Sequence, residues 1–243
     1  MRLVKILAVG DVHGFRHLNI LLASLKTLIN MKPDLIIFAG DMIDGGNIRE
    51  LRTIMEGIES KFSNVPVISV FGNEEYHEVE SELIREYPYI TWLNDSITII
   101  YVDEVKVGIV GSRGALEKLT HWQRKNKPVL EKVYRERPRI IENLIREVKK
   151  EADITIYLSH YAPTFITVRG EPERILPYMG SRDIEGVLRR TKPDVAIHAH
   201  AHNARILEAV LDGVRIYNVS LPARKGVTMI NISPKNLSAF MSN

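Results

Sequence analysis

The chain contains no cysteine among its 243 residues. Disulfide bonds, thiol nucleophiles, cysteine-based zinc fingers and iron–sulfur sites are therefore excluded. No apolar run reaches the ~18 residues that a membrane-spanning helix needs, so we expect no membrane partner. The sequence opens on a predicted strand and shows no charged leader with a cleavage site, which favours a cytoplasmic location.

A large excess of one charge is also missing. The 33 Lys and Arg residues nearly balance the 30 Asp and Glu residues, which leaves a formal net charge of +3. So small an excess does not indicate a polyanionic partner, and nucleic acid remains an open but unsupported one. With 45% hydrophobic residues, the chain can form one large core, and we expect a single domain over residues 1–243. Assembly into a homo-oligomer is left open.

Short apolar runs rich in β-branched residues recur along the chain and predict buried strands. They occupy residues 3–9, 35–38, 67–71, 154–158 and 195–197. Segments with helical periodicity lie between apolar runs, at residues 18–29, 48–62, 79–87 and 184–190. This alternation of strand and helix predicts the α/β class.

Two further pairs of apolar runs indicate antiparallel hairpins. Residues 97–102 and 105–110 flank Asp103 and Glu104, while 206–211 and 214–219 flank Asp212 and Gly213. An Asp-Gly dipeptide between strands is a strong hairpin signal. We therefore expect mixed sheets rather than one purely parallel sheet.

Polar residues follow directly after each of the five predicted buried strands. Seven of them could bind a metal: Asp11, His13, Asp41, Asn73, His160, His200 and His202. Open α/β sheets bind ligands outside the carboxyl ends of their strands, so these side chains should converge. One Asp or His at a strand end is more often a turn former or a helix cap. The ordered set favours a site instead.

The chemistry of this set indicates two metal ions. Aspartates, imidazoles and one amide suit Mn²⁺, Fe, Co²⁺, Ni²⁺ or Zn²⁺ and argue against soft metals. Seven ligands are too many for one tetrahedral ion. They fit two ions about 3.5–4 Å apart that share a carboxylate.

The order Asp-x-His, Gly-Asp, Gly-Asn, His and His-x-His closely resembles the calcineurin-like metallophosphoesterase superfamily, in particular its branch related to cyclic-nucleotide phosphodiesterases. The resemblance runs from the first strand to about residue 233. It implies two stacked mixed β-sheets flanked by helices, an αββα sandwich. It also implies hydrolysis of a phosphate ester by in-line attack of a water or hydroxide that bridges two metal ions.

The resemblance also implies a role for each ligand. Asp41 would bridge the two ions. One ion would be held by Asp11, His13 and His202, and the other by Asn73, His160 and His200. Manganese is the metal that we expect first, with iron, nickel, cobalt and zinc as alternatives. The residues expected to take part in catalysis are Asp41, Asn73, Glu74 and His200.

Glu74 is the main departure from the family pattern, because the family usually has a histidine there, over the scissile phosphate. A carboxylate beside two dications stays ionised and supplies no positive charge. We therefore expect weaker catalysis on esters with poor leaving groups. Ala199 replaces the usual glycine of the last motif, which a negative φ tolerates. His198, the first histidine of that motif, is predicted to be structural.

A cation near the site could compensate for the missing histidine. Arg16, His77 and Arg182 are the candidate substrate-binding residues, because each lies in or beside a loop near a motif. Ser181 begins a predicted helix whose backbone N–H groups could bind an anion. Each of the three cations could equally be a solvated loop residue, and Ser181 a plain helix cap.

Residues 113–150 separate the third and fourth ligand motifs and contain twelve Lys and Arg residues, with Trp122 and Tyr134 among them. Their composition predicts a helical insertion with breaks near Pro128 and Pro138. This basic insertion could be a lid that binds the non-scissile part of a substrate. It could equally be a solvated helical pair whose charges are balanced by glutamates.

Together these features predict a metal-dependent phosphoric ester hydrolase, with phosphodiesters preferred over monoesters. The preference rests on the missing family histidine and on the branch that the sequence resembles. A nuclease of the same fold is one alternative, although no DNA-binding domain is evident. A catalytically weak metal-binding protein that interacts with other proteins is another, and Glu74 is the feature in its favour.

Overall fold

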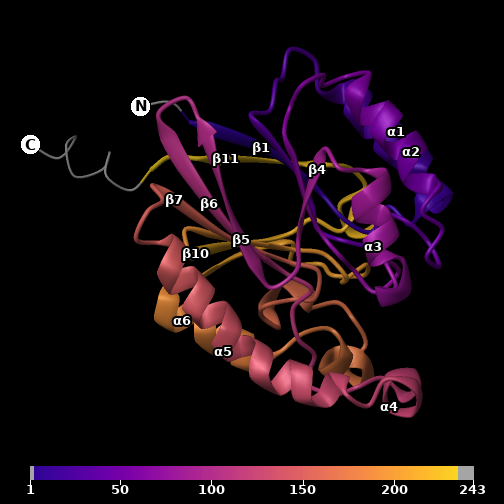
Figure 1. Ribbon diagram of the computed structural model, residues 1–243, viewed down its shortest axis with the longest axis vertical. Helices are drawn as coiled ribbons and strands as arrows, with labels where there is room; N and C mark the ends of the chain where they lie inside the picture. Colours follow the sequence, from indigo (N-terminus) through magenta and orange to yellow (C-terminus); the bar gives the residue numbers. More distant parts are fainter. Residues whose placement is uncertain (1–2, 235–243) are drawn as a thin grey trace, which may run out of the picture.

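The computed structural model describes residues 3–234 and shows two β-sheets stacked between two layers of helices (Figure 1). The first sheet has the order β11-β1-β2-β3-β4, and β11 is antiparallel to β1. Its strands are β11 (Thr228–Ile232), β1 (Val4–Val9), β2 (Leu35–Phe38), β3 (Val67–Val70) and β4 (Ile90–Leu93). The four strands from β1 to β4 are parallel.

The second sheet has the order β5-β6-β7-β8-β10-β9. Its strands are β5 (Ser96–Val102), β6 (Val105–Ser112), β7 (Ile154–Ser159), β8 (Val195–His198), β9 (Glu208–Leu211) and β10 (Val214–Asn218). The pairs β5–β6 and β9–β10 are antiparallel, and the other neighbours are parallel. The expected α/β fold of two stacked mixed sheets is therefore confirmed, as are both predicted hairpins.

Strand residues alternate between two cores, as the period of two in a strand requires. In β1, Ile6 and Ala8 pack in the core between the sheets, while Leu7 and Val9 pack against the helices outside the first sheet. Because both faces are covered, these strands consist mainly of apolar residues.

Helices cover the outer face of each sheet (Figure 1). The helices α1 (Leu18–Thr27), α2 (Glu50–Glu59) and α3 (His77–Glu86) lie on the first sheet. The helices α5 (Leu130–Val148) and α6 (Arg182–Thr191) lie on the second sheet. The short elements are η1 (Gly14–Arg16), α4 (His121–Asn126), η2 (Ile166–Val168), η3 (Glu173–Tyr178) and α7 (Leu221–Arg224).

One expectation about the basic insertion is wrong. The predicted break near Pro128 falls between α4 and α5, but α5 continues through Pro138. A proline inside a helix costs about 3 kcal/mol. The same helix buries Ile141, Ile145 and Val148 against the second sheet, and each such side chain contributes about 1.5–3 kcal/mol. Packing therefore outweighs the local preference for a break.

Within residues 3–234, none of the helices combines the length and the apolar character that crossing a membrane requires.

Candidate metal centre

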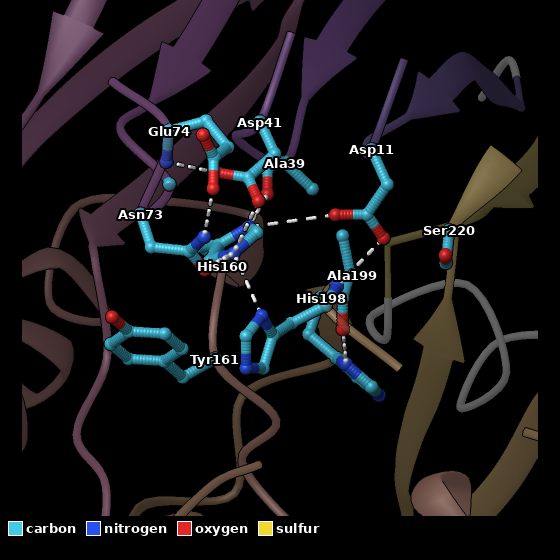
Figure 2. Close-up of polar contacts among 12 residues, drawn as sticks. Asp11, Ala39, Asp41, Asn73, Glu74, His160, Tyr161, His198, Ala199 and Ser220 are labelled. Carbon is cyan, nitrogen blue, oxygen red and sulfur yellow. Dashed lines mark hydrogen bonds and ion pairs between the residues drawn. The ribbon is translucent and has the colours of Figure 1, made fainter. Parts of the chain in front are cut away.

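The carboxyl ends of β1, β2, β3, β7 and β8 meet at one edge of the stacked sheets, and the predicted ligands lie in the loops that follow them. Figure 2 shows four of them, Asp11, Asp41, Asn73 and His160, close to one another. Their side chains form two groups that could each hold a metal ion. One group is Asp11, His13 and His202, and the other is Asp41, His160 and His200. Within each group the candidate ligand atoms all lie within 4.8 Å of one another. The structure thus brings together residues that are far apart in the sequence.

The first group has buried polar atoms that make no hydrogen bond. Oδ1 of Asp11, both ring nitrogens of His13 and Nε2 of His202 are buried and make no hydrogen bond. An unpaired buried polar group costs about 1–3 kcal/mol. A divalent cation coordinated by these atoms would remove that cost, so the residues present fit such an ion.

The second group includes Asn73 as a further oxygen donor. Nε2 of His160 lies 3.0 Å from Oδ1 of Asn73 and 3.1 Å from Nδ1 of His200. The opposite ring nitrogens face backbone carbonyls, Nδ1 of His160 at 3.0 Å from Ala39 and Nε2 of His200 at 3.1 Å from Tyr178. A ring N–H that donates to a carbonyl leaves the other nitrogen free to bind a metal.

One carboxylate oxygen lies between the two groups. Oδ2 of Asp41 is 3.4 Å from Nε2 of His160 in the second group and 3.8 Å from Nε2 of His13 in the first. Oδ1 of the same carboxylate accepts a hydrogen bond of 2.8 Å from the backbone N–H of Glu74. Asp41 is therefore fixed in a position from which it could contact an ion in either group.

The backbone is strained at these positions. Asp11, His13, Asp41 and His200 have φ values of 57°, 48°, 53° and 69°, in the left-handed region. Such a conformation costs about 1–3 kcal/mol for a non-glycine residue and clusters at functional sites. The sharp turns direct the side chains back across the ends of the strands.

The ionisable groups of the site shift one another's pKa values. Burial opposes ionisation of Asp11, but the nearby His202 and His160 hold the pKa of that carboxyl well below its usual value. Burial also opposes the charged form of His160, yet the Asp41 carboxylate raises the pKa of this imidazole to about 9. Burial and the neighbouring His160 lower the pKa of His200 to about 4. At neutral pH the ionised carboxylates and the neutral His200 are in the forms that metals bind, whereas His160 is protonated in the metal-free site and would release a proton on binding an ion.

Glu75 and Arg113 contact the loops that carry the candidate ligands, and neither was predicted from the sequence to have a role in the site. The buried Glu75 carboxylate accepts hydrogen bonds from the backbone N–H groups of Asp41, Met42, Ile43 and Gly72, at 2.6–3.2 Å. The Arg113 guanidinium donates to the carbonyls of Gly72 and Glu75 and to the Glu80 carboxylate. Arg113 follows β6 directly, so its place at the end of a strand was a usable signal.

Gly72 is required by the close approach of two loops. A Cβ at this position would lie 2.1 Å from Oδ1 of Asp41. The missing side chain therefore lets the loop after β3 reach the carboxylate that lies between the two groups.

The last motif agrees with the sequence analysis. His198 is buried, and its ring nitrogens contact the Ala199 carbonyl at 2.8 Å and the Thr167 hydroxyl at 2.7 Å, which makes it structural. Ala199 has no left-handed φ. Its methyl group is accommodated opposite Gly10, where a Cβ would lie 2.5 Å away.

Glu74 contacts a candidate ligand rather than standing free over the site (Figure 2). Its Oε1 accepts a hydrogen bond of 3.0 Å from Nδ2 of Asn73, and its Oε2 accepts one of 2.9 Å from the backbone N–H of Gly45. These contacts turn Oδ1 of Asn73 toward His160. In this arrangement Glu74 positions Asn73.

The three candidate substrate-binding cations all have carboxylate partners. Arg16 pairs with Asp44 at 2.9 Å, and His77 pairs with Glu80 at 2.6 Å. Arg182 donates to both oxygens of Glu117 and lies over the Phe165 ring. His77 lines the cavity beside the second group, whereas Arg182 lines a different hollow. The substrate-binding roles of these residues stay predictions.

A cavity of about 630 Å³ opens beside Asn73 and His200. The N-terminal part of the basic insertion, residues 113–134, contributes side chains to the cavity wall. The remainder of α5 packs on the second sheet. The insertion therefore combines features of both alternatives from the sequence analysis, a lid and a packed helix. Its status as an insertion stays a prediction.

Comparison with known proteins agrees with this geometry. The family model for calcineurin-like phosphoesterases matches residues 4–204. No curated protein sequence matches the chain.

Several solved structures share the fold at low sequence identity. A phosphopantetheinyl hydrolase from Mycobacterium tuberculosis aligns with a TM-score of 0.67 and 15% identity, over 91% of this chain and 90% of its own. A putative 5′-nucleotidase from Staphylococcus aureus aligns at 0.64 and 18% identity, over 97% of this chain and 52% of its own. A dimetal phosphatase from Danio rerio aligns with a TM-score of 0.58 and 12% identity, over 89% of this chain and 87% of its own. At these identities the structures show the fold alone.

Proposed function

Since the chain belongs to the calcineurin-like phosphoesterase family, we propose that it hydrolyses a phosphodiester with the help of two divalent metal ions. The observation that carries this proposal is the position of Asp41. Its Oδ2 lies within 3.4–3.8 Å of a histidine nitrogen from each ligand group. A single carboxylate shared by two sets of donors is the arrangement that a two-metal hydrolase needs.

We assign the ligands as the sequence predicts. Asp11, His13 and His202 would hold one ion, Asn73, His160 and His200 the other, and Asp41 both. When bound, the two ions would neutralise phosphate oxygens and lower the pKa of a water molecule. The chain's own contribution is to hold the ligands rigidly, through the carbonyls behind His160 and His200 and through the Glu75 and Arg113 contacts.

The preference for a diester follows from charge. A phosphomonoester carries a charge of about −1.5 to −2 at pH 7, whereas a diester carries one negative charge. The position after Asn73, which supplies a histidine in most of the family, holds Glu74, and the nearby Arg16 and His77 already face Asp44 and Glu80. A site with so few free cations suits the less charged ester.

Hydrolysis of bis-p-nitrophenyl phosphate beside p-nitrophenyl phosphate tests the proposal directly. Metal-stripped protein would receive Mn²⁺, Ni²⁺, Co²⁺, Zn²⁺ or Mg²⁺, and we expect Mn²⁺ to give the fastest release from the diester. Faster release from the monoester would contradict the diester preference but leave the metal centre standing.

The same assay addresses the second candidate function, a metal-binding interaction protein. If neither ester is hydrolysed with any of the metals, although two ions still bind per chain, the proposed hydrolysis is wrong. That result would make the replacement by Glu74 the first explanation to test.

A further inference from the structure

Building on the proposed hydrolysis, we infer that the cavity beside Asn73 and His200 binds an uncharged aromatic ring, about the size of a nucleoside, on one arm of the diester. The cavity adjoins the second ligand group directly, since both residues line it. An ester bound at the second group would therefore lie next to the cavity. The cavity volume of about 630 Å³ lies within the range of small-molecule sites.

Aromatic and apolar side chains dominate the cavity wall. They come from four separate segments: Tyr76 before α3, residues 116–134, Tyr161 after β7 and Tyr178 in η3. The aromatic and aliphatic lining residues are Tyr76, Leu116, Trp122, Leu130, Tyr134, Tyr161 and Tyr178. A wall of this kind offers ring faces on which a second ring can stack.

Trp122 and Tyr76 remain exposed although they are large and aromatic. Their exposed fractions are 60% and 45%, and they belong to different parts of the cavity wall. Trp122 lies in α4, which the capping box of Thr120 and Gln123 and the bond from Gln123 to Tyr134 hold in place. A ring held by its backbone but open to solvent is available for a ligand.

The charges in the cavity are already neutralised. Lys127 pairs with Glu78, and both Arg113 and His77 pair with Glu80. Glu74 adds another carboxylate to the lining. A second phosphate or a carboxylate on the ester arm would find no free cation here, so the wall favours a neutral ring.

Two probe diesters, one with and one without an aromatic base, test this inference. One is the methyl ester of thymidine 5′-monophosphate, and the other is the methyl ester of 2-deoxyribose 5-phosphate, which lacks the base. We expect the thymidine diester to inhibit bis-p-nitrophenyl phosphate hydrolysis about 10-fold more strongly, since stacking on one ring contributes about that factor. Equal inhibition constants would overturn the inference.

Trp122→Ala should remove most of the advantage of the base while leaving inhibition by the base-free diester unchanged. Tyr101→Ala is the matched control, because Tyr101 is 66% exposed on β5 and is not part of the cavity. An equal loss in both variants, or no loss in Trp122→Ala, would contradict the role of this wall.

A binding measurement separates this inference from the proposed hydrolysis. In a Trp92→Phe background, Trp122 is the single tryptophan, and the thymidine diester should quench its fluorescence even when no ester is hydrolysed. Without quenching the cavity role fails, whatever the hydrolysis assay gives. A thymidine diester with an added 3′-phosphate should bind no more tightly than the parent, and tighter binding would refute the preference for an uncharged arm.

Discussion

Asp41 is held from two sides, by the N–H of Glu74 on Oδ1 and by histidine nitrogens near Oδ2. Replacing it with asparagine removes the charge that both ligand groups share while preserving the shape. We expect Asp41→Asn to lower kcat/KM at least about 100-fold, which corresponds to about 2.7 kcal/mol of activation free energy. We also expect it to weaken the binding of both metal ions. Diester hydrolysis and calorimetric metal titration measure the two effects.

Asp44→Asn is the matched control for that change. Asp44 lies 3.6 Å from Nδ1 of His13 but pairs with Arg16 and belongs to neither ligand group. We expect it to lose much less activity than Asp41→Asn. Full turnover in Asp41→Asn would refute the assignment of the centre.

Glu74 fixes the amide of Asn73 through a single hydrogen bond of 3.0 Å. We expect Glu74→Ala to lower the affinity of the second group for its metal ion about 10- to 100-fold, because groups that orient a metal ligand typically contribute that much to metal affinity. Titration of metal-free protein with Mn²⁺ would show one weakened step and one unchanged step. Glu78→Ala, which loses only the partner of Lys127, should leave both steps unchanged.

At the scale of residues, the sequence predicted which side chains would lie near one another, because each proposed ligand follows an apolar strand run. It could not reveal that Glu74 turns toward Asn73, because a side-chain direction depends on the neighbouring loop at Gly45. The supporting role of Glu75 could not be predicted from the sequence either, because its four N–H donors come from two loops that only the folded sheet brings together.

Helices α5 and α6 are joined by a charged contact on their outer side. The Glu142 carboxylate accepts hydrogen bonds from Arg190 at 2.7 Å and from Arg146 at 2.8 Å. These partners lower the pKa of Glu142 to about 2. The contact lies at the surface, so its contribution to the free energy of unfolding should be small.

The sign of its pH dependence follows from the lowered pKa. The stabilisation is fully present above the ordinary pKa of 4.5 and is lost as the pH falls toward 2. Glu142→Gln should therefore lower Tm by up to about 4 °C at pH 7 and progressively less below pH 4.5. Glu136→Gln, whose partner Lys132 is 3.9 Å away, should change Tm little at any pH. A constant difference from pH 7 to pH 3 would contradict this account.

Element boundaries show where local rules prevailed and where they failed. The Asp212–Gly213 turn forms as expected, with φ values of 48° and 88° at its two residues. Pro138 was the exception, since the apolar face of α5 is worth more than the hydrogen bond that proline removes. Strand β4 was not identified from the sequence, because the exposed Thr91 interrupts its short apolar run.

The molecule as a whole should depend on its metal ions for stability. The buried atoms of Asp11, His13 and His202 that make no hydrogen bond should destabilise the metal-free protein, and ions that bind only the folded state would stabilise it. At 100 times the dissociation constant, one ion adds about 2.7 kcal/mol. We expect Mn²⁺ to raise Tm by about 5–10 °C over protein in EDTA, measured by circular dichroism. A similar rise in Asp41→Asn would show that the ion binds elsewhere.

Each ligand group draws donors from both sheets. In one group, Asp11 and His13 follow a strand of the first sheet and His202 follows a strand of the second. In the other, Asp41 and Asn73 follow strands of the first sheet, while His160 and His200 follow strands of the second. Two bound ions would consequently act as cross-links between the layers of the sandwich. Opening the interface between the sheets would require breaking coordination bonds before water could enter, so the ions should lengthen the lifetime of the folded state as well as raise its equilibrium stability.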